Sequence, residues 1–195
     1  MINFNPQLTT APQNSFLLTT EGYVQGAVMD DPSSRMYLTS GQIASSVSQP
    51  VWGGMAITEN VPAANTLGSS LVLAANNASV TGFTVFNQAN NGIITPGNNV
   101  QQYGAGMTTS FFRLGSNARI AVQCSAALAT VLDTGSIAQQ VSWDFVNQQL
   151  IPYSSSIGAL PVKVLSVNAN SKIVSYNSST GAVTWGAGAA AIIQL

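Results

Sequence analysis

The sequence predicts an all-β protein built as an antiparallel sandwich or barrel, with one short helix and an extended N-terminal arm. Roughly nine to twelve short segments rich in β-branched and aromatic residues follow one another, and turn residues separate them about every ten positions. Only one stretch has the composition of a helix. No repeat of roughly 20–50 residues indicates a propeller or a solenoid. Many short strands with frequent turns are typical of sandwiches and barrels.

Residues 1–20 predict the extended arm, because they contain two prolines, five Asn or Gln residues and little hydrophobic periodicity. A frayed terminus is the alternative. An arm of this kind satisfies its backbone groups by pairing on a neighbouring subunit. Residues 21–195 show no shift in composition and predict a single β domain. The arm residues that we expect to contact the neighbour are Phe4, Asn5, Pro6, Gln7 and Leu8.

The first half of the β domain predicts six short strands separated by turns. Asp30–Ser34 is the clearest turn, and Asn91–Gly92 is the strongest hairpin signal in the chain. Pro50–Gly54 predicts a corner in which the ring of Trp52 packs under a tight turn. The expected strands are Tyr23–Val28, Met36–Leu38, Ile43–Val47, Met55–Ile57, Ser70–Leu73 and Phe83–Phe86.

The best-specified packing is expected between Ser110 and Tyr153, the stretch around which we expect the rest of the chain to be arranged. Two segments in it, Arg119–Cys124 and Gln139–Val146, alternate apolar and polar residues with a period of two, as half-buried strands do. Cys124 shares the apolar face of the first segment, whereas Ser142 lies on the opposite, polar face of the second. The expected core residues are Phe111, Ile120, Val122, Val141, Trp143 and Phe145.

Between these two strands the sequence predicts a helix of about two turns. Ser125 is suited to the N-cap, Ala126–Leu132 are helix formers or apolar residues, and Gly135 stands where the helix would end. Three strands are expected after it, at Pro161–Val167, Lys172–Tyr176 and Ala182–Gly186. Ser178, Ser179, Thr180 and Gly181 are expected to close the last two strands into a hairpin.

The composition combines 46% hydrophobic residues with only 6% charged residues, against roughly 25% charged residues in ordinary soluble domains. Asn, Gln, Ser and Thr supply the polarity instead, so the surface lacks the charge repulsion that keeps monomers apart. A net charge of −1 with scattered basic residues argues against nucleic acid and anionic membranes as partners. The N-terminus lacks the features of a secretory signal. The apolar stretch Ala182–Leu195 is interrupted by glycines and is shorter than the ~20 residues of a membrane span.

The sequence offers little catalytic chemistry, and we expect no enzyme, no metal and no cofactor. The chain has no histidine, and its single cysteine, Cys124, is expected to be a small core residue. Asp133 and Asp144 are possible paired carboxylates of a glycosidase, but a turn residue and an outward strand residue are the simpler interpretations. Asp30 and Asp31 suit a solvated bend better than a cation site, because no third ligand is specified.

A carbohydrate-binding module or a host-receptor-binding module of a virion or fimbria is the alternative function. Asn and Gln side chains can line a sugar-binding groove beside an aromatic platform such as Trp52, Trp143 or Trp185. Trp143 lies on the apolar face of its predicted strand, so core packing is the favoured interpretation for that residue. This alternative predicts solvent-exposed aromatic rings and carboxylates in loops, whereas the aromatic residues of this chain mostly fall on the apolar faces of the expected strands.

The central stretch resembles the capsid cement, or decoration, proteins of tailed bacteriophages. The resemblance is carried by FFRLGSNARIAVQC (Phe111–Cys124) and QQVSWDFVNQQL (Gln139–Leu150), with FTVFNQANNGI (Phe83–Ile93) upstream and the FNPQ sequence of the arm. It covers most of the chain and is strong in about a third of it. The C-terminal sequence GAGAAAIIQL has no counterpart that we assign in that family.

The resemblance implies a jelly-roll-like or tulip-like fold and a structural function in the bacteriophage virion. The expected partners are the major capsid protein, whose shell is bound on its outer surface, and the chain itself, as a homodimer or homotrimer. Such a protein is made in the host cytoplasm. Copies that add contact area across the seams between capsomers stabilise the head together. The low charge of this chain agrees with such a function, because uncharged side chains form contacts without desolvating ions.

Overall fold

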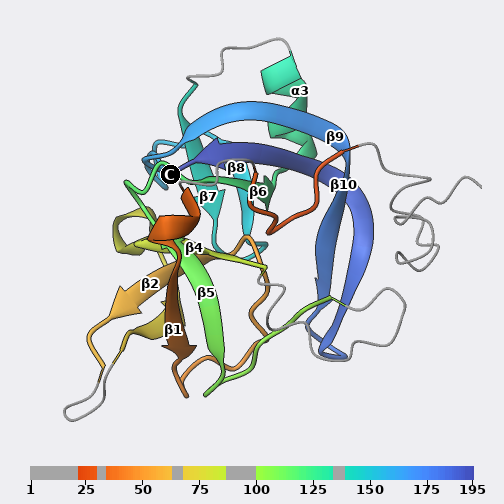
Figure 1. Cartoon of the computed structure of the whole chain (residues 1–195). Helices are drawn as coiled ribbons and strands as arrows, with labels where there is room; N and C mark the ends of the chain where they lie inside the picture. Colours follow the sequence, from red (N-terminus) through yellow and green to blue (C-terminus); the bar gives the residue numbers. More distant parts are fainter. Residues whose placement is uncertain (1–21, 30–33, 63–67, 87–99, 134–138) are drawn as a thin grey trace, which may run out of the picture.

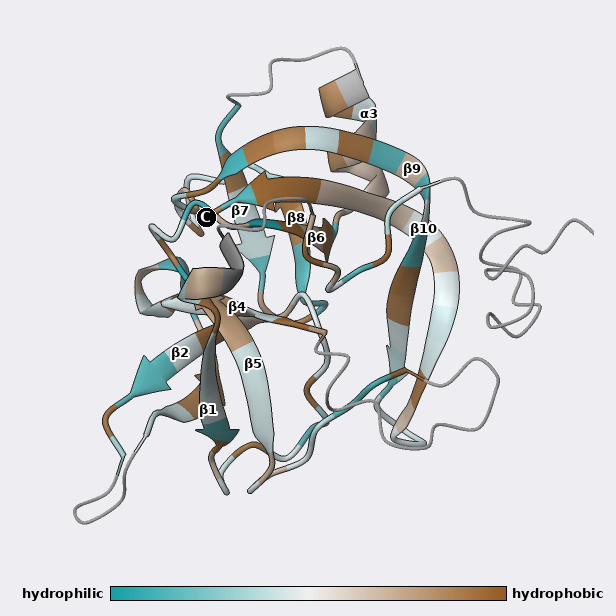
Figure 2. Ribbon diagram, in the orientation of Figure 1, coloured by the Kyte–Doolittle hydropathy of each residue, from teal (hydrophilic) through white to brown (hydrophobic). Residues whose placement is uncertain are grey.

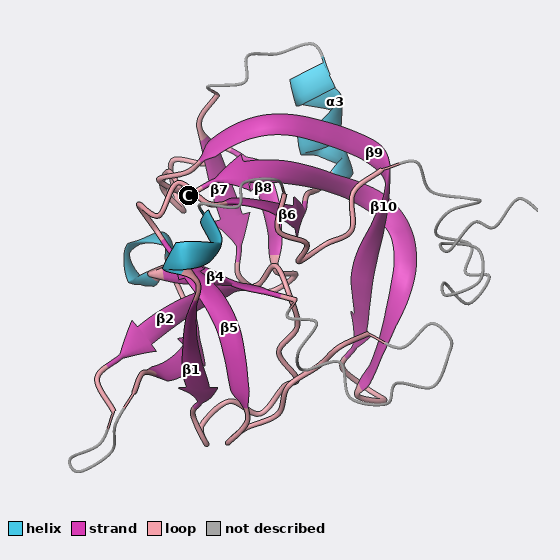
Figure 3. Ribbon diagram, in the orientation of Figure 1, coloured by secondary structure: helices cyan, strands magenta, loops and turns pink. Residues whose placement is uncertain are grey.

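The computed structural model describes residues 22–29, 34–62, 68–86, 100–133 and 139–195, and these residues form a mostly β structure (Figure 1, Figure 3). The expectation of an all-β class is confirmed. In these ranges the α-helix α3 (Ala126–Asp133) and two short 3₁₀ turns, η1 (Ser34–Tyr37) and η2 (Asn77–Ser79), accompany ten strands. No helix in these ranges is long and apolar enough to cross a bilayer. The arm residues Phe4–Leu8 lie outside the described residues.

Five strands close into a small barrel with the neighbour order β1-β3-β2-β4-β5. All neighbours are antiparallel except β1 and β3, which pair in parallel and depart from the expected antiparallel pattern. Arg113 of β5 forms a bidentate ion pair with Glu59 of β2, with N–O distances of 2.7 Å. The barrel strands are β1 (Thr39–Ile43), β2 (Ala56–Asn60), β3 (Ser70–Leu73), β4 (Gly82–Val85) and β5 (Thr108–Arg113).

A second sheet of three strands lies beside the barrel and contains a long bent hairpin. Its order is β6 (Arg119–Gln123), β10 (Ala182–Gln194) and β9 (Lys163–Asn177), all antiparallel. The hairpin turn has Gly181 at φ +70° with its N–H bonded to the carbonyl of Asn177, as the turn residues predict. In Figure 1 the hairpin arches over the sheet and then descends beside the barrel. We call β9 and β10 together the ribbon.

The helix α3 (Ala126–Asp133) and the two-stranded sheet of β7 (Val141–Asp144) and β8 (Gln149–Pro152) complete the structure. The hydroxyl oxygen of Ser125 accepts a hydrogen bond from the backbone N–H of Leu128 at 3.2 Å, so Ser125 is the expected N-cap. Gly135, expected at the helix end, lies outside the described residues.

Residues 22–29 form a connecting segment that bonds to both sheets. The amide of Gly26 donates to the carbonyl of Ala121 in β6, and the amide of Gln25 donates to the carbonyl of Lys172 in β9. The carbonyl of Gly26 also accepts the amide of Phe86, next to the barrel strand β4. We call residues 22–29 the linking segment, because it bonds to both outer strands of the second sheet, β6 and β9, and also to Phe86 beside the barrel.

One large cluster of buried apolar residues joins the two sheets. It includes Phe83 and Phe112 from the barrel, Leu128 from α3 and Ile193 from β10. Phe111 faces the other way, into the barrel, where it packs with Ile57 and Leu71. The expected core residues Phe111, Ile120, Val122, Val141 and Trp143 are each 0% exposed, and Phe145 is partly buried against the cluster.

The structure differs from the expected strands in three places in the first half. The strand expected at Tyr23–Val28 is wrong, because these residues lie in the linking segment, where Val24 and Val28 form isolated bridges to Lys172 and Ile120. Met36 lies in the 3₁₀ turn η1 rather than in a strand, and its side chain is 85% exposed. The nearby strand occupies Thr39–Ile43 and not Ile43–Val47, because β5 provides the pairing partner for the earlier residues. After Ile43 the chain turns, and the amide of Val47 bonds to the carbonyl of Ala44.

Two further differences from the expectations concern the strand face on which Ser142 lies and an expected break between two strands. Ser142 was expected on a polar outer face but is buried, where its hydroxyl donates to the carbonyl of Gly158 and accepts from the amide of Ser154. The two strands expected at Pro161–Val167 and Lys172–Tyr176 are parts of the single strand β9. The pairing with β10 continues past a register shift at which Gly188 pairs with Ser171 and Ala190 with Asn168, so β9 has the extra residue there.

Replacing Trp143 with alanine tests the main core. Its ring is fully buried and meets the ring of Phe83 edge-on, with centroids 5.1 Å apart. We expect Trp143→Ala to lower the free energy of unfolding by about 3–5 kcal/mol, because a cavity is left behind. Urea denaturation measures the change. The control Val146→Ala, at a side chain 89% exposed, should cost less than ~0.5 kcal/mol. A loss below about 1 kcal/mol for Trp143→Ala would contradict the assignment.

Candidate functional site: an uncharged pocket between the ribbon and two turns

The tight turn between β7 and β8 forms one wall of the candidate site. Asp144 organises this turn: its Oδ1 accepts hydrogen bonds from the amides of Val146 and Asn147, and its Oδ2 accepts from the Asn147 side chain at 2.7 Å. The side chain of Gln149 also donates to it. Partial burial acts to raise the pKa of Asp144, but these hydrogen bonds outweigh it and hold the pKa below its usual range.

Gln148 fixes this turn to the barrel. It adopts a left-handed backbone conformation with φ +52° and is 2% exposed. Its side-chain Oε1 accepts hydrogen bonds from the amide of Ala56 at 3.2 Å and from the indole of Trp143 at 3.3 Å, and its Nε2 donates to the carbonyl of Phe145. A buried side-chain amide with these partners is satisfied and holds the turn in place.

The opposite wall is aromatic. Trp52 stands in the corner expected at Pro50–Gly54 and is 4% exposed. The ring of Tyr176, from β9, lies beside it with centroids 5.7 Å apart and an interplanar angle of 43°. The indole Nε1 of Trp52 is buried and has no hydrogen-bond partner among the described residues. Gly54 is the last residue of the corner and has φ +84°, a conformation that favours glycine.

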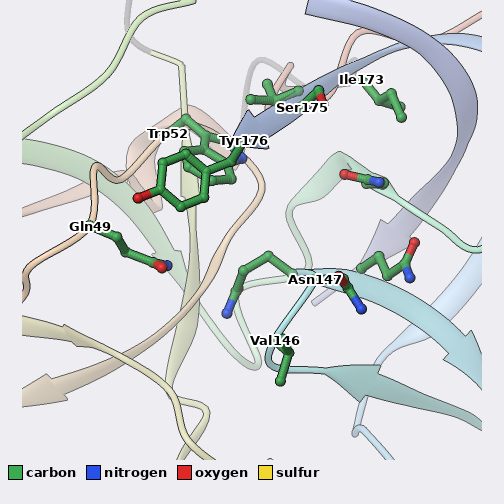
Figure 4. A pocket seen from close by; sticks show the side chains of 11 residues that line it. Gln49, Trp52, Val146, Asn147, Ile173, Ser175 and Tyr176 are labelled. Atoms are coloured by element: carbon green, nitrogen blue, oxygen red, sulfur yellow. The ribbon is translucent and has the colours of Figure 1, made fainter. Parts of the chain in front are cut away.

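Between these walls lies a pocket of about 240 Å³ (Figure 4). Figure 4 shows Tyr176 over Trp52, Gln49 near them, and Val146 and Asn147 across the hollow. Among the described residues, no Asp, Glu, Lys or Arg lines it. The lining residues are Gln49, Trp52, Gln123, Val146, Asn147, Gln148, Gln149, Ile173, Val174, Ser175 and Tyr176.

This lining hydrogen-bonds neutral groups and supplies no conventional acid, base or metal ligand. Side-chain amides and hydroxyls both donate and accept hydrogen bonds, and the aromatic rings provide an apolar surface. Among the described residues no three His, Cys, Asp or Glu side chains come together as a metal site would require. The chemistry that the geometry supports is recognition of an uncharged polar molecule.

The structure brings together only some of the residues considered from the sequence. Of the three tryptophans, Trp52 lines the pocket and Trp143 is in the core. Trp185 packs against the ring of Phe86, and the Nζ of Lys172 lies 5.1 Å from the centroid of the Trp185 ring. Asp30 and Asp31, the side chain of Asp133 and the Asn91–Gly92 hairpin signal lie outside the described residues.

The polar lining was not predicted residue by residue. Gln49, Gln123, Asn147 and Ser175 lie in four separate parts of the chain and meet only after the ribbon folds over the turns. The available signals were the general excess of Asn and Gln and the corner at Trp52. No local motif connects them.

Comparison of the chain with protein-family models, with curated proteins and with solved structures found no match in any of the three. The assignment of function therefore depends on the site, the surface and the resemblance of the central stretch.

The single cysteine gives a test of core packing beside the site. Cys124 follows β6 and is 3% exposed, and burial raises the pKa of its thiol to about 12. We expect the folded protein to show almost no reaction with a disulfide reagent at pH 8, because both thiolate formation and access are suppressed. One thiol per chain should react at once in concentrated guanidinium chloride. Rapid reaction of the folded chain would contradict this placement.

Proposed function

We propose that this protein is a structural virion protein, a capsid cement protein that binds the outer surface of a major capsid protein shell and stabilises the head. The resemblance of Phe111–Cys124 and Gln139–Leu150 to bacteriophage decoration proteins suggests this function. The proposed protein acts as a homodimer or homotrimer on the capsid. It has no enzymatic activity and needs neither nucleic acid nor membrane.

The observation that carries the proposal is the low charge of the ribbon surface, whose two charged residues are the exposed Lys163 and the partly buried Lys172. Strands β9 and β10 together have nine exposed positions, and all but Lys163 are Ser, Asn, Thr or Ala. Figure 2 shows hydrophobic and hydrophilic residues alternating along β9, while the middle of β10 has intermediate hydropathy. Most of a long ribbon with such a surface can be covered by another protein without burying an ion.

Desolvation explains why this surface suits an assembly. An ion that loses its water on association needs a well-placed partner, whereas hydroxyl and amide groups exchange one hydrogen bond for another at small net cost. Contacts of this kind are also little affected by salt. Many modest contacts repeated over a shell then add to its stability.

The proposal includes the jelly-roll-like or tulip-like relationship implied by the resemblance. The described strands form a five-stranded barrel next to a three-stranded sheet and a two-stranded sheet. A large shared core and a mostly antiparallel arrangement support the relationship, and the parallel pair β1 and β3 is the feature that such a relationship must accommodate.

Charges placed on the ribbon test the proposed interface. The purified chain should bind saturably to capsids stripped of decoration, at a copy number set by the shell symmetry. The double variant Ala169→Glu with Ala182→Glu, at two exposed ribbon positions, should bind about tenfold more weakly or worse, because unpaired carboxylates lose water on association. Sedimentation with the capsids and gel densitometry measure the occupancy.

The matched control is Ala127→Glu, at an exposed position of α3, which should bind as the unmodified chain does. Absence of saturable binding by the unmodified chain would refute the cement function. Equal occupancy for the ribbon variant would exclude the ribbon from the interface.

The expected arm gives a separate prediction. Deleting residues 1–18 should leave the β domain folded, because the linking segment and all strands remain, while attachment to the shell weakens. Circular dichroism checks the fold, and capsid occupancy checks attachment. Unchanged occupancy would rule out the arm as a contact.

A further inference from the structure

The pocket between Trp52 and the turn from β7 to β8 has the chemistry of a binding site that cementing alone does not use. We propose that it binds one ring of a neutral saccharide, so that the protein also recognises a glycan. This proposal is independent of the capsid function and is argued from the lining groups.

Three lining side chains are available for a ligand. The side chains of Gln49, Gln123 and Ser175 line the pocket and form no hydrogen bond with any other residue in the part of the chain that the structure describes. Each sugar hydroxyl is both a donor and an acceptor. Side-chain amides and hydroxyls can either donate a hydrogen bond to a sugar hydroxyl or accept one from it. An ionised carboxylate can only accept, and an ammonium group can only donate.

The turn adds acceptors in fixed positions. Asp144 accepts from the Nδ2 of Asn147 at 2.7 Å and from the side chain of Gln149. This engages the amide nitrogens, so the side-chain oxygens of Asn147 and Gln149 remain as acceptors for hydroxyl protons. Gln148 between them holds the turn through hydrogen bonds to Ala56, Trp143 and Phe145, so its role is to position the site.

The aromatic wall supplies the second requirement of sugar recognition. One face of a pyranose presents C–H groups, which pack well against an aromatic ring. Tyr176 is partly exposed at the pocket and rests on the almost fully buried Trp52, which restricts its movement.

Charge and size select the kind of sugar. The described lining has no charged group, and the carboxylate of Asp144, bonded to the lining residues Val146 and Asn147, stays ionised because its hydrogen bonds lower its pKa. An anionic sugar would therefore lose water without finding a cation and would face this negative charge. The volume of about 240 Å³ is below the ~300–1,000 Å³ of most small-molecule sites, which suits one ring of a longer glycan.

The test uses the full chain in solution without capsids. The neutral probes are methyl α-D-glucopyranoside, methyl α-D-galactopyranoside, methyl α-D-mannopyranoside and N-acetylglucosamine, and the anionic probe is N-acetylneuraminic acid. Saturation-transfer NMR and titration of tryptophan fluorescence should show saturable binding of at least one neutral probe with a Kd of about 1–10 mM, typical for a single small ring. The anionic probe should bind at least about tenfold more weakly.

Variants separate the pocket from the rest of the surface. Tyr176→Ala and Gln123→Ala should each weaken the best neutral probe by about tenfold, whereas Tyr153→Ala, at an exposed tyrosine outside the pocket, should not. Gln123→Glu keeps the size of the side chain and should also weaken binding. Unchanged thermal unfolding of Gln123→Glu shows that the loss is not a loss of fold.

Several results would overturn the proposal. They are no binding of any neutral probe at about 50 mM, equal binding of the anionic probe, or affinity unaffected by both pocket variants. A change in the solution mass of the chain on Tyr176→Ala would assign the pocket to a contact between copies and would also overturn it. Because the test contains no capsid, its failure leaves the cement function untouched. Failure to bind capsids likewise leaves the glycan site untouched.

Discussion

The hydrogen bonds of the linking segment, residues 22–29, are the constraint on which the arrangement of the two sheets depends. The segment bonds to β6 on one side and to β9 on the other, and the buried Oε1 of Gln25 accepts the amide of Val174 at 2.8 Å. Gly26 makes this close approach possible, because it has φ +83° and a Cβ there would lie 2.6 Å from the Cα of Gly53. The ribbon is thereby held against the corner of Trp52, and the pocket exists only in this arrangement.

The features that local chemistry determines were predictable from the sequence. The strand Ser70–Leu73 and the N-cap at Ser125 have the expected positions, and Gly181 stands in the turn of the ribbon. In each case the deciding interactions lie within a few residues. Period-two alternation also identified the inward residues of β6 and β7, of which Trp143 is the largest.

The features that distant partners determine were not predictable. Ser142 is polar but buried, because Gly158 and Ser154 from a later loop satisfy its hydroxyl. The Asn-rich part of β9 reads as a break, yet β10 carries the strand through it with a register shift. The pocket lining is the least predictable feature, because Gln49, Gln123 and Ser175 come to line one pocket only through contacts between segments far apart in sequence.

The pairing of β6 with the end of β10 has a consequence for the order of folding. Residues 119–123 of β6 are bonded on one side to the linking segment and on the other to residues 190–194 of β10. During synthesis on the ribosome, β6 therefore emerges well before one of its two neighbours exists. Contacts between residues so far apart in sequence form slowly. Until β10 is in place, the unpaired edge of β6 is therefore exposed and can pair with strands of other chains. The barrel, whose strands all precede β6, can close first and shelter the faces of Phe111 and its neighbours while the ribbon is completed.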